Sequence, residues 1–266
     1  EISEGLVGSE MCIRDSNYLE NIRNNSISTR NSRLAAIHSF FKYLQYEYPD
    51  YIDEYTKILN IPFKKVKTKQ MSYLTVEEMI KLIGVIDKSS EYGYRDYMII
   101  LLMYESAIRV SELINVRLID FRFSKPYSIK IVGKGNKQRY VPLSEQFIEK
   151  IQEYVLSLNN KKLETDFLFT NHSNNKLTRA GVSHILNKYV TIARKNNLSL
   201  FQENVTPHSL RHTKAMHLLQ DDVNLIYIRD ILGHSSIQTT EIYARADSAR
   251  LRQAIETVSY THLRAH

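Results

Sequence analysis

Residues 206–245 read TPHSLRHTKAMHLLQDDVNLIYIRDILGHSSIQTTEIYAR, and this stretch decides how the chain is interpreted. Thr206 is a favourable N-cap and Pro207 suits the first helical position, so a helix is predicted to begin there. His208 and Arg211 lie three residues apart and therefore share one face of its first turns. The positive end of the helix dipole and free backbone N–H groups lie beside them. The stretch predicts an anion site, with phosphate as the favoured ligand.

Further side chains would complete a phosphoryl-transfer site. Tyr243 supplies a hydroxyl nucleophile, although a phenol with a pKa of ~10 needs activation at neutral pH. A second donor for the phosphate oxygens and an acid for the leaving oxygen are also required. Arg109, in SAIRVSEL, and Lys134, in VGKGNKQRYVPL, are the candidates for these two roles. Lysine suits the second role because an ammonium group can give up a proton, which a guanidinium scarcely does.

Five short motifs occur in one order along the chain: the AIRVSEL segment 107–113, the GKG turn 133–135, HSLRH 208–212, LGH 232–234 and Tyr243, nine residues after His234. Together they resemble the tyrosine recombinase (phage integrase) family, and in particular its Xer-like site-specific recombinases. The resemblance covers about residues 17–257. One departure is Ala107, where the family usually has glycine, so some backbone strain is expected beside Arg109.

The resemblance implies a transesterification. The tyrosine attacks the scissile phosphate, which gives a 3′-phosphotyrosyl link and a free 5′-hydroxyl, and no ATP, metal or other cofactor is needed. Arg109 and Arg211 would stabilise the charge on the non-bridging oxygens, His208 and His234 would assist, and Lys134 would protonate the leaving oxygen. The residues expected to be catalytic are thus Arg109, Lys134, His208, Arg211, His234 and Tyr243.

The implied partner is double-stranded DNA that carries specific recombination sites, and the implied assembly on this DNA is a homo-tetramer. The resemblance also implies a cytoplasmic location, either at a bacterial nucleoid or for a chain encoded by a phage or mobile element. Two alternatives stay open: a type IB topoisomerase-like enzyme with the same chemistry, and a non-catalytic DNA-binding relative. A covalent protein–DNA adduct is expected for the recombinase and for the topoisomerase-like enzyme, but not for the non-catalytic relative.

The histidines also allow a metal site to be considered, since His208 and His212 are four residues apart and His217 follows. No HExxH motif and no acidic residue at ligand spacing accompanies them, so no metal is predicted. His212 is expected to have a structural role, and Glu112 is expected to buttress Arg109 or its helix.

The two ends of the chain share an unusual relation. Residues 7–15, VGSEMCIRD, can be encoded by a DNA segment whose reverse complement encodes VSYTHLRAH, which is residues 258–266. This DNA resembles the transposon-end adapter of sequencing libraries. We therefore expect residues 1–16 and 258–266 to be translated adapter, and they are left out of the fold prediction.

Composition and charge are compatible with this interpretation. The formal net charge is +7, from 36 basic and 29 acidic residues, which predisposes a protein to polyanions. The single cysteine, Cys12, excludes an internal disulfide and a thiolate zinc site, and an intracellular location is the default. The longest apolar run, Met98–Met103, is too short to cross a membrane.

The predicted fold is mainly α with a small antiparallel β-sheet. Residues 17–70 are expected to form a partial helical core-binding domain and a basic linker, and residues 71–257 an α+β catalytic domain. Helices are predicted at 28–48, capped by Ser28 or Thr29, and at 76–87, where Thr75 and Glu78 form a capping box. Residues 128–132 and 138–141 are predicted to form a β-hairpin around the GKG turn.

Basic residues outside the catalytic set are candidates for contact with backbone phosphates. For Arg30 and Arg33 the alternative is a merely solvated helix face, and for Lys65 a solvated tether, because charged side chains commonly lie on exposed faces. The candidates are Arg30, Arg33, Lys65, Lys137, Arg139 and Arg179.

Overall fold

The computed structural model describes residues 22, 24–66, 71–158, 163–197, 199–201 and 204–246; for residues 134, 245 and 246 it describes the backbone only. The two ends that we interpret as adapter lie outside this part. The chain divides into two compact units between Lys69 and Gln70.

The first unit is a helical pair, α2 (Ile27–Glu47) and α3 (Ile52–Leu59), joined through a 3-10 turn. Leu34 on α2 packs with Ile58 and Ile61 in a small core. The predicted cap of α2 was wrong by a few residues: the Ser26 side chain accepts from the backbone N–H of Thr29 (3.2 Å), so the helix begins at Ile27.

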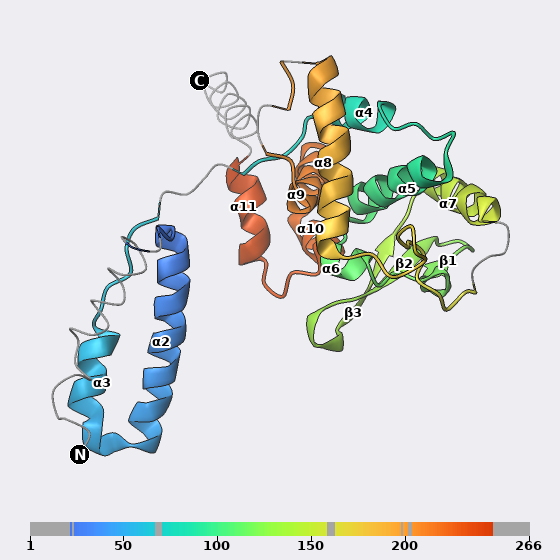
Figure 1. The fold of residues 1–266 in the computed structure, drawn as a ribbon. Helices are drawn as coiled ribbons and strands as arrows, with labels where there is room; N and C mark the ends of the chain where they lie inside the picture. Colours follow the sequence, from blue (N-terminus) through green and yellow to red (C-terminus); the bar gives the residue numbers. More distant parts are fainter. Residues whose placement is uncertain are drawn as a thin grey trace, which may run out of the picture. The chain divides into compact units, whose positions relative to one another are not determined.

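The second unit contains a layer of helices and one small sheet (Figure 1). Its helices within the described residues are α4 (Val76–Gly84), α5 (Glu91–Ser106), α6 (Val110–Leu113), α7 (Glu145–Ser157), α8 (Arg179–Asn196), α9 (Pro207–Gln220), α10 (Leu225–Leu232) and α11 (Gln238–Ala246). Among the described residues no helix combines the length and apolar character needed to cross a bilayer.

Capping chemistry sets several helix starts. The capping box of Thr75 and Glu78 is confirmed at α4, and Thr206 caps α9 with Pro207 in its first turn, as predicted. α5 starts earlier than its apolar run because Ser90 accepts from the backbone N–H of Gly93 (3.1 Å).

The sheet is antiparallel, in the order β1 (Phe121–Arg122), β2 (Ser128–Val132) and β3 (Gln138–Pro142). β2 and β3 form the predicted hairpin, with Ile131 opposite Arg139, and a 3-10 turn (Lys134–Asn136) joins them. The hairpin projects from the helical layer (Figure 1). The prediction of a mainly helical chain with a small antiparallel sheet is confirmed.

Two clusters of buried side chains hold the second unit together. The larger joins α4, α5, α7 and α8 to the sheet, with Ile99 and Ile129 fully buried in it. The smaller joins the loop after α5 to α9, α10 and α11, and it contains Ala107 and Tyr243. The elements that carry the predicted site therefore meet around this smaller cluster.

Candidate active site

Arg211 lies at the centre of the predicted site. It is on α9, its side chain is fully buried, and its guanidinium crosses to two neighbouring segments. Nη1 donates to the carbonyl oxygen of Ala107 (2.6 Å) and Nη2 to that of Leu232 at the end of α10. Burial, together with nearby Arg109 and Arg139, lowers the pKa of Arg211 to about 9, which leaves it charged at neutral pH.

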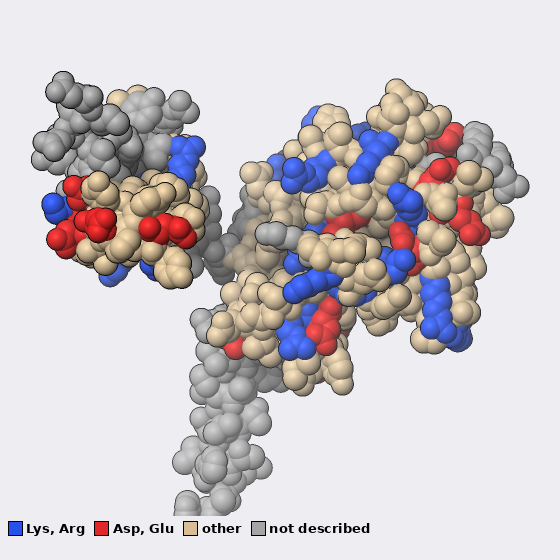
Figure 2. All heavy atoms as spheres, turned by 90° about the horizontal axis from the view of Figure 1, so that it is seen from below, with Lys and Arg blue, Asp and Glu red and all other residues tan. Residues whose placement is uncertain are grey.

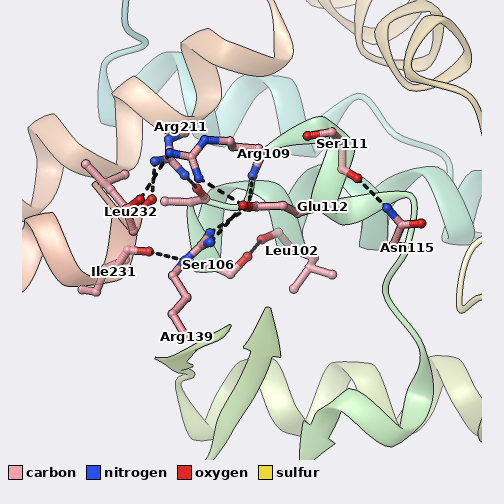
Figure 3. Close-up of polar contacts among 12 residues, drawn as sticks. Leu102, Ser106, Arg109, Ser111, Glu112, Asn115, Arg139, Arg211, Ile231 and Leu232 are labelled. Atoms are coloured by element: carbon pink, nitrogen blue, oxygen red, sulfur yellow. Dashed lines mark hydrogen bonds and ion pairs between the residues drawn. The ribbon is translucent and has the colours of Figure 1, made fainter. Parts of the chain in front are cut away.

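Arg109 is the N-cap residue of α6 and keeps its side chain partly exposed. Nη1 donates to Glu112 Oε1 (3.0 Å), and Nη2 lies 3.4 Å from the carbonyl oxygen of Gly233. Figure 3 shows Arg109 and Arg211 side by side above Glu112. The expectation that Glu112 buttresses Arg109 is confirmed by this ion pair.

Ala107, two residues before Arg109, has the left-handed backbone conformation (φ 48°, ψ 31°) that the glycine of the family predicts. The expected strain at an alanine is present, and the residue is nonetheless fully buried. Its carbonyl oxygen accepts from Arg211, so this turn connects the two arginines.

Three histidines surround the arginines. The rings of His208 and His212 are edge to face, with centroids 4.2 Å apart, and His234 Nδ1 lies 3.0 Å from Thr240 Oγ1. Burial, with the charges of Arg211 and Arg109, lowers the pKa of His208 below its ordinary value and that of His234 to about 4. Because the imidazoles add no charge and the arginines are positive, the site has a net positive charge that favours binding of an anion.

Tyr243 is on α11, and its side chain is almost fully buried. Its hydroxyl lies 2.9 Å from His212 Nδ1. Burial raises the pKa of Tyr243, an effect that Arg211 and Arg109 oppose. Burial, with His208, Arg211 and His234, lowers the pKa of His212 to about 4, so its neutral ring can accept the phenolic hydrogen.

His212 thus lies closer to the candidate nucleophile Tyr243 than the sequence indicated. We expected a structural role, yet its ring contacts the candidate nucleophile directly. Its spacing of four residues from His208 was the available signal, because it puts both rings on one helix face.

Arg109 and His234 face an open cleft of ≈ 1280 Å³, which is also lined by Glu112, Gly133, Arg139 and Gly233, among others. The hairpin with Lys134 forms one wall. The side chain of Lys134 lies outside the described part, but its neighbour Gly133 is next to Glu112: a Cβ on Gly133 would be 3.2 Å from Glu112 Oε1. The backbone at Lys134 is therefore adjacent to the anchor of Arg109.

Comparisons with known proteins identify the family of the chain. Residues 72–250 match the family model described as "Phage integrase family". The chain belongs to the phage integrase family.

Named relatives are tyrosine recombinases. The chain is 34% identical to tyrosine recombinase XerA of Pyrococcus horikoshii, covering 90% of this chain and 77% of XerA. It is 31% identical to XerC of Staphylococcus epidermidis, covering 89% of this chain and 78% of XerC. A solved structure of XerH bound to its difH substrate before cleavage superposes with a TM-score of 0.73 at 28% identity, covering 95% and 71% of the two chains. Like these relatives, this phage integrase family member is a tyrosine recombinase.

The residues predicted to contact DNA backbone divide into two groups. Arg33, Lys65, Lys137 and Arg179 are exposed, as a phosphate contact requires. Arg30 and Arg139 are directed into the protein instead. Arg30 is 5% exposed and its Nη1 donates to the carbonyl oxygen of Pro62 (2.9 Å), so it joins α2 to the segment after α3. Its placement contradicts the expected phosphate contact, because helical packing turns this face inward.

No group of three or more His, Cys, Asp or Glu side chains that would hold a metal ion occurs among the described residues. In this phage integrase family member His208 contacts His212, His212 contacts Tyr243, and His234 contacts Thr240.

The depressed pKa of His212 gives the recombinase a predictable dependence on pH. Between about pH 6.5 and pH 4 the unfolded chain binds a proton at this position and the folded chain does not. Stability is therefore complete above this window and falls as the pH falls through it. We expect His212→Gln to have a shallower loss of unfolding free energy between pH 7.5 and 5 than the wild type, measured by urea denaturation. The exposed His184→Gln is the control, and equal slopes for all three proteins would contradict the assignment.

Proposed function

We propose that this chain cleaves and rejoins double-stranded DNA at specific sites through a 3′-phosphotyrosyl intermediate, with Tyr243 as the nucleophile. The observation that carries the proposal is that the Tyr243 hydroxyl, two arginines and three histidines come together in one part of the fold, where Arg109 and His234 line an open cleft. This is the set of groups that an attack on a phosphodiester requires.

In the proposed reaction the Tyr243 oxygen forms a bond to phosphorus and the bond from phosphorus to the 5′-oxygen breaks. Arg109 and Arg211 stabilise the charge on the non-bridging oxygens, and His208 and His234 donate hydrogen bonds to them. The phenolic proton passes to His212 Nδ1, whose basicity rises once an anionic phosphate enters the site. Lys134 gives a proton to the leaving 5′-oxygen.

The bond energy is kept in the phosphotyrosyl ester. A 5′-hydroxyl of a second strand can therefore reverse the reaction and seal the DNA without ATP. Exchange between two duplexes needs four such cleavages, so we propose a homo-tetramer on two DNA sites, acting in the cytoplasm of a bacterial host or for a mobile element.

Support for DNA as the partner comes from relatives and from charge. XerH was solved bound to its difH substrate, and a Tn1549 transposon integrase, 18% identical, shares the fold. On the face of the second unit seen in Figure 2, Lys and Arg side chains are spread over the surface, with Asp and Glu side chains among them. We propose that exposed Arg33, Lys65, Lys137 and Arg179 contact backbone phosphates, which would make binding weaken as salt is added. We also propose that residues 17–70 form a partial core-binding domain and its linker, and residues 71–257 the catalytic domain.

The experiment uses a library of nicked duplexes with randomised centres. A nick placed a few nucleotides to the 3′ side of the scissile phosphate lets the short fragment with the new 5′-hydroxyl diffuse away, so that the covalent complex accumulates. We expect adducts that survive SDS, with protein on the 3′-end of DNA and a free 5′-hydroxyl on the released fragment, and sequencing of the captured DNA gives the target site. Specific DNA binding without any adduct would favour the non-catalytic alternative, and relaxation of supercoiled DNA without strand exchange would favour the topoisomerase-like one.

A further inference from the structure

Arg139 makes contacts that are not those of a DNA-binding arginine. It is on β3, next to the hairpin turn, and only 13% of its side chain is exposed. Nη1 and Nη2 donate to the two carboxylate oxygens of Glu112 (2.9 and 2.8 Å), and Nε donates to the carbonyl oxygen of Ile231 (3.1 Å). One guanidinium therefore joins the hairpin to α6 and to the end of α10, as Figure 3 shows.

Glu112 is the shared partner in this arrangement. It is 6% exposed, and besides Arg139 it accepts from Nη1 and from the backbone N–H of Arg109 (both 3.0 Å). Despite burial, hydrogen bonds from Arg139 and Arg109 hold the pKa of Glu112 below its ordinary value. This buried carboxylate is therefore held by hydrogen bonds from two arginines, which come from α6 and from the hairpin.

Two glycines allow the close approach of this ion pair to the flanking loops. Gly233, just before His234, has φ +61°, and a Cβ there would lie 2.8 Å from Arg139 Cδ. Gly133, just before Lys134, would place a Cβ 3.2 Å from Glu112 Oε1. The Arg139–Glu112 pair thus lies between Gly233 and Gly133. These glycines come directly before His234 and Lys134, two of the proposed catalytic residues.

We propose that Arg139 is a positioning residue, which holds the β2–β3 hairpin, and with it Lys134, in register against the arginines of the active site. It does so through Glu112 and the Ile231 carbonyl and makes no contact with DNA. This inference rests on the proposed function, since it assigns Lys134 the protonation of the leaving oxygen. Arg109 keeps its own hydrogen bonds to Glu112 when Arg139 is replaced, so the main effect is expected at the hairpin.

The test compares two nicked substrates that differ at one atom. In one the leaving group is the ordinary 5′-oxygen, and in the other a 5′-bridging sulfur. A thiolate leaves without protonation because a thiol is far more acidic than an alcohol, so the sulfur substrate bypasses Lys134. Arg139→Lys keeps the charge but loses the bidentate pairing with Glu112.

We expect Arg139→Lys to form adduct about 100-fold more slowly than wild type on the oxygen substrate, in line with the loss of a general acid. On the sulfur substrate its rate should approach that of wild type, and its affinity for DNA should be unchanged. Gly133→Ala perturbs the same contact from the hairpin side and should behave in the same way if Arg139→Lys folds poorly. Lys137→Ala, an exposed neighbour, is the matched control and should weaken binding equally for both substrates.

Equal slowing of Arg139→Lys and Gly133→Ala on both substrates, or wild-type rates on both, would overturn the positioning role. So would a loss of DNA affinity in Arg139→Lys that matches that of Lys137→Ala. If the wild type forms no adduct with either substrate, the proposed function fails and this inference fails with it. A wild type that reacts while the variants show no oxygen–sulfur difference overturns the inference alone.

Discussion

Replacing Tyr243 by phenylalanine is expected to abolish covalent capture of DNA while folding and DNA binding persist. The substitution removes one oxygen from a buried side chain, and the interaction lost is the hydrogen bond to His212 Nδ1. The ring keeps its place among Ala107, Met216 and Leu232, so packing should be preserved. Because the nucleophile itself is gone, adduct formation should fall by at least ~10⁴-fold.

The measurement is the fraction of nicked DNA retained on protein after SDS, alongside binding by fluorescence anisotropy. Tyr227→Phe is the matched control, since Tyr227 is 65% exposed on the neighbouring helix α10. Adduct that persists in Tyr243→Phe would mean that another group attacks the phosphate.

Replacing Arg211 by alanine is expected to damage both stability and catalysis. Its two guanidinium nitrogens satisfy the carbonyl oxygens of Ala107 and Leu232 inside the protein. Each buried carbonyl left without a partner costs about 1–3 kcal/mol. Loss of a fixed cation at the phosphate should slow cleavage by ~10³-fold or more, even at temperatures where the variant is folded.

Arg211→Lys separates the two effects, because it keeps the charge and loses the forked geometry that reaches both carbonyls. We expect intermediate stability in urea denaturation and a rate of adduct formation still well below that of wild type. Arg229→Ala, which removes a surface ion pair with Asp230, is the control and should change neither quantity appreciably. Cleavage by Arg211→Lys at the wild-type rate would show that the geometry of the guanidinium is dispensable.

The elements of the fold were predictable where local chemistry determines them. The Thr75–Glu78 capping box, the start of α9 at Pro207 and the hairpin around residues 133–135 follow from the sequence, because caps and turns depend on neighbours a few residues away. The left-handed conformation of Ala107 followed from the family's glycine rather than from any local signal.

Side-chain contacts across long separations were not predictable. Arg139 meets Ile231 across 92 residues, and His212 meets Tyr243 across 31. Hydrophobic periodicity gives the face of a helix that is buried, but it does not give the rotation of α11 against α9. For the same reason Arg139, a basic residue in a turn-rich and positively charged segment, was predicted to contact phosphate. It pairs with the buried carboxylate of Glu112 instead.

The left-handed backbone at Ala107 affects both the stability of the protein and the rigidity of the turn beside Arg109. A left-handed alanine costs about 1–2 kcal/mol relative to glycine, while its methyl group narrows the choices open to the unfolded chain. The first contribution is the larger, because the restriction of the unfolded chain is worth only about 0.4–1 kcal/mol, so Ala107→Gly is expected to raise the free energy of unfolding modestly. The methyl group also restricts the backbone. With alanine at position 107, the turn that connects Arg109 to the carbonyl bound by Arg211 has fewer alternative conformations than it would have with glycine.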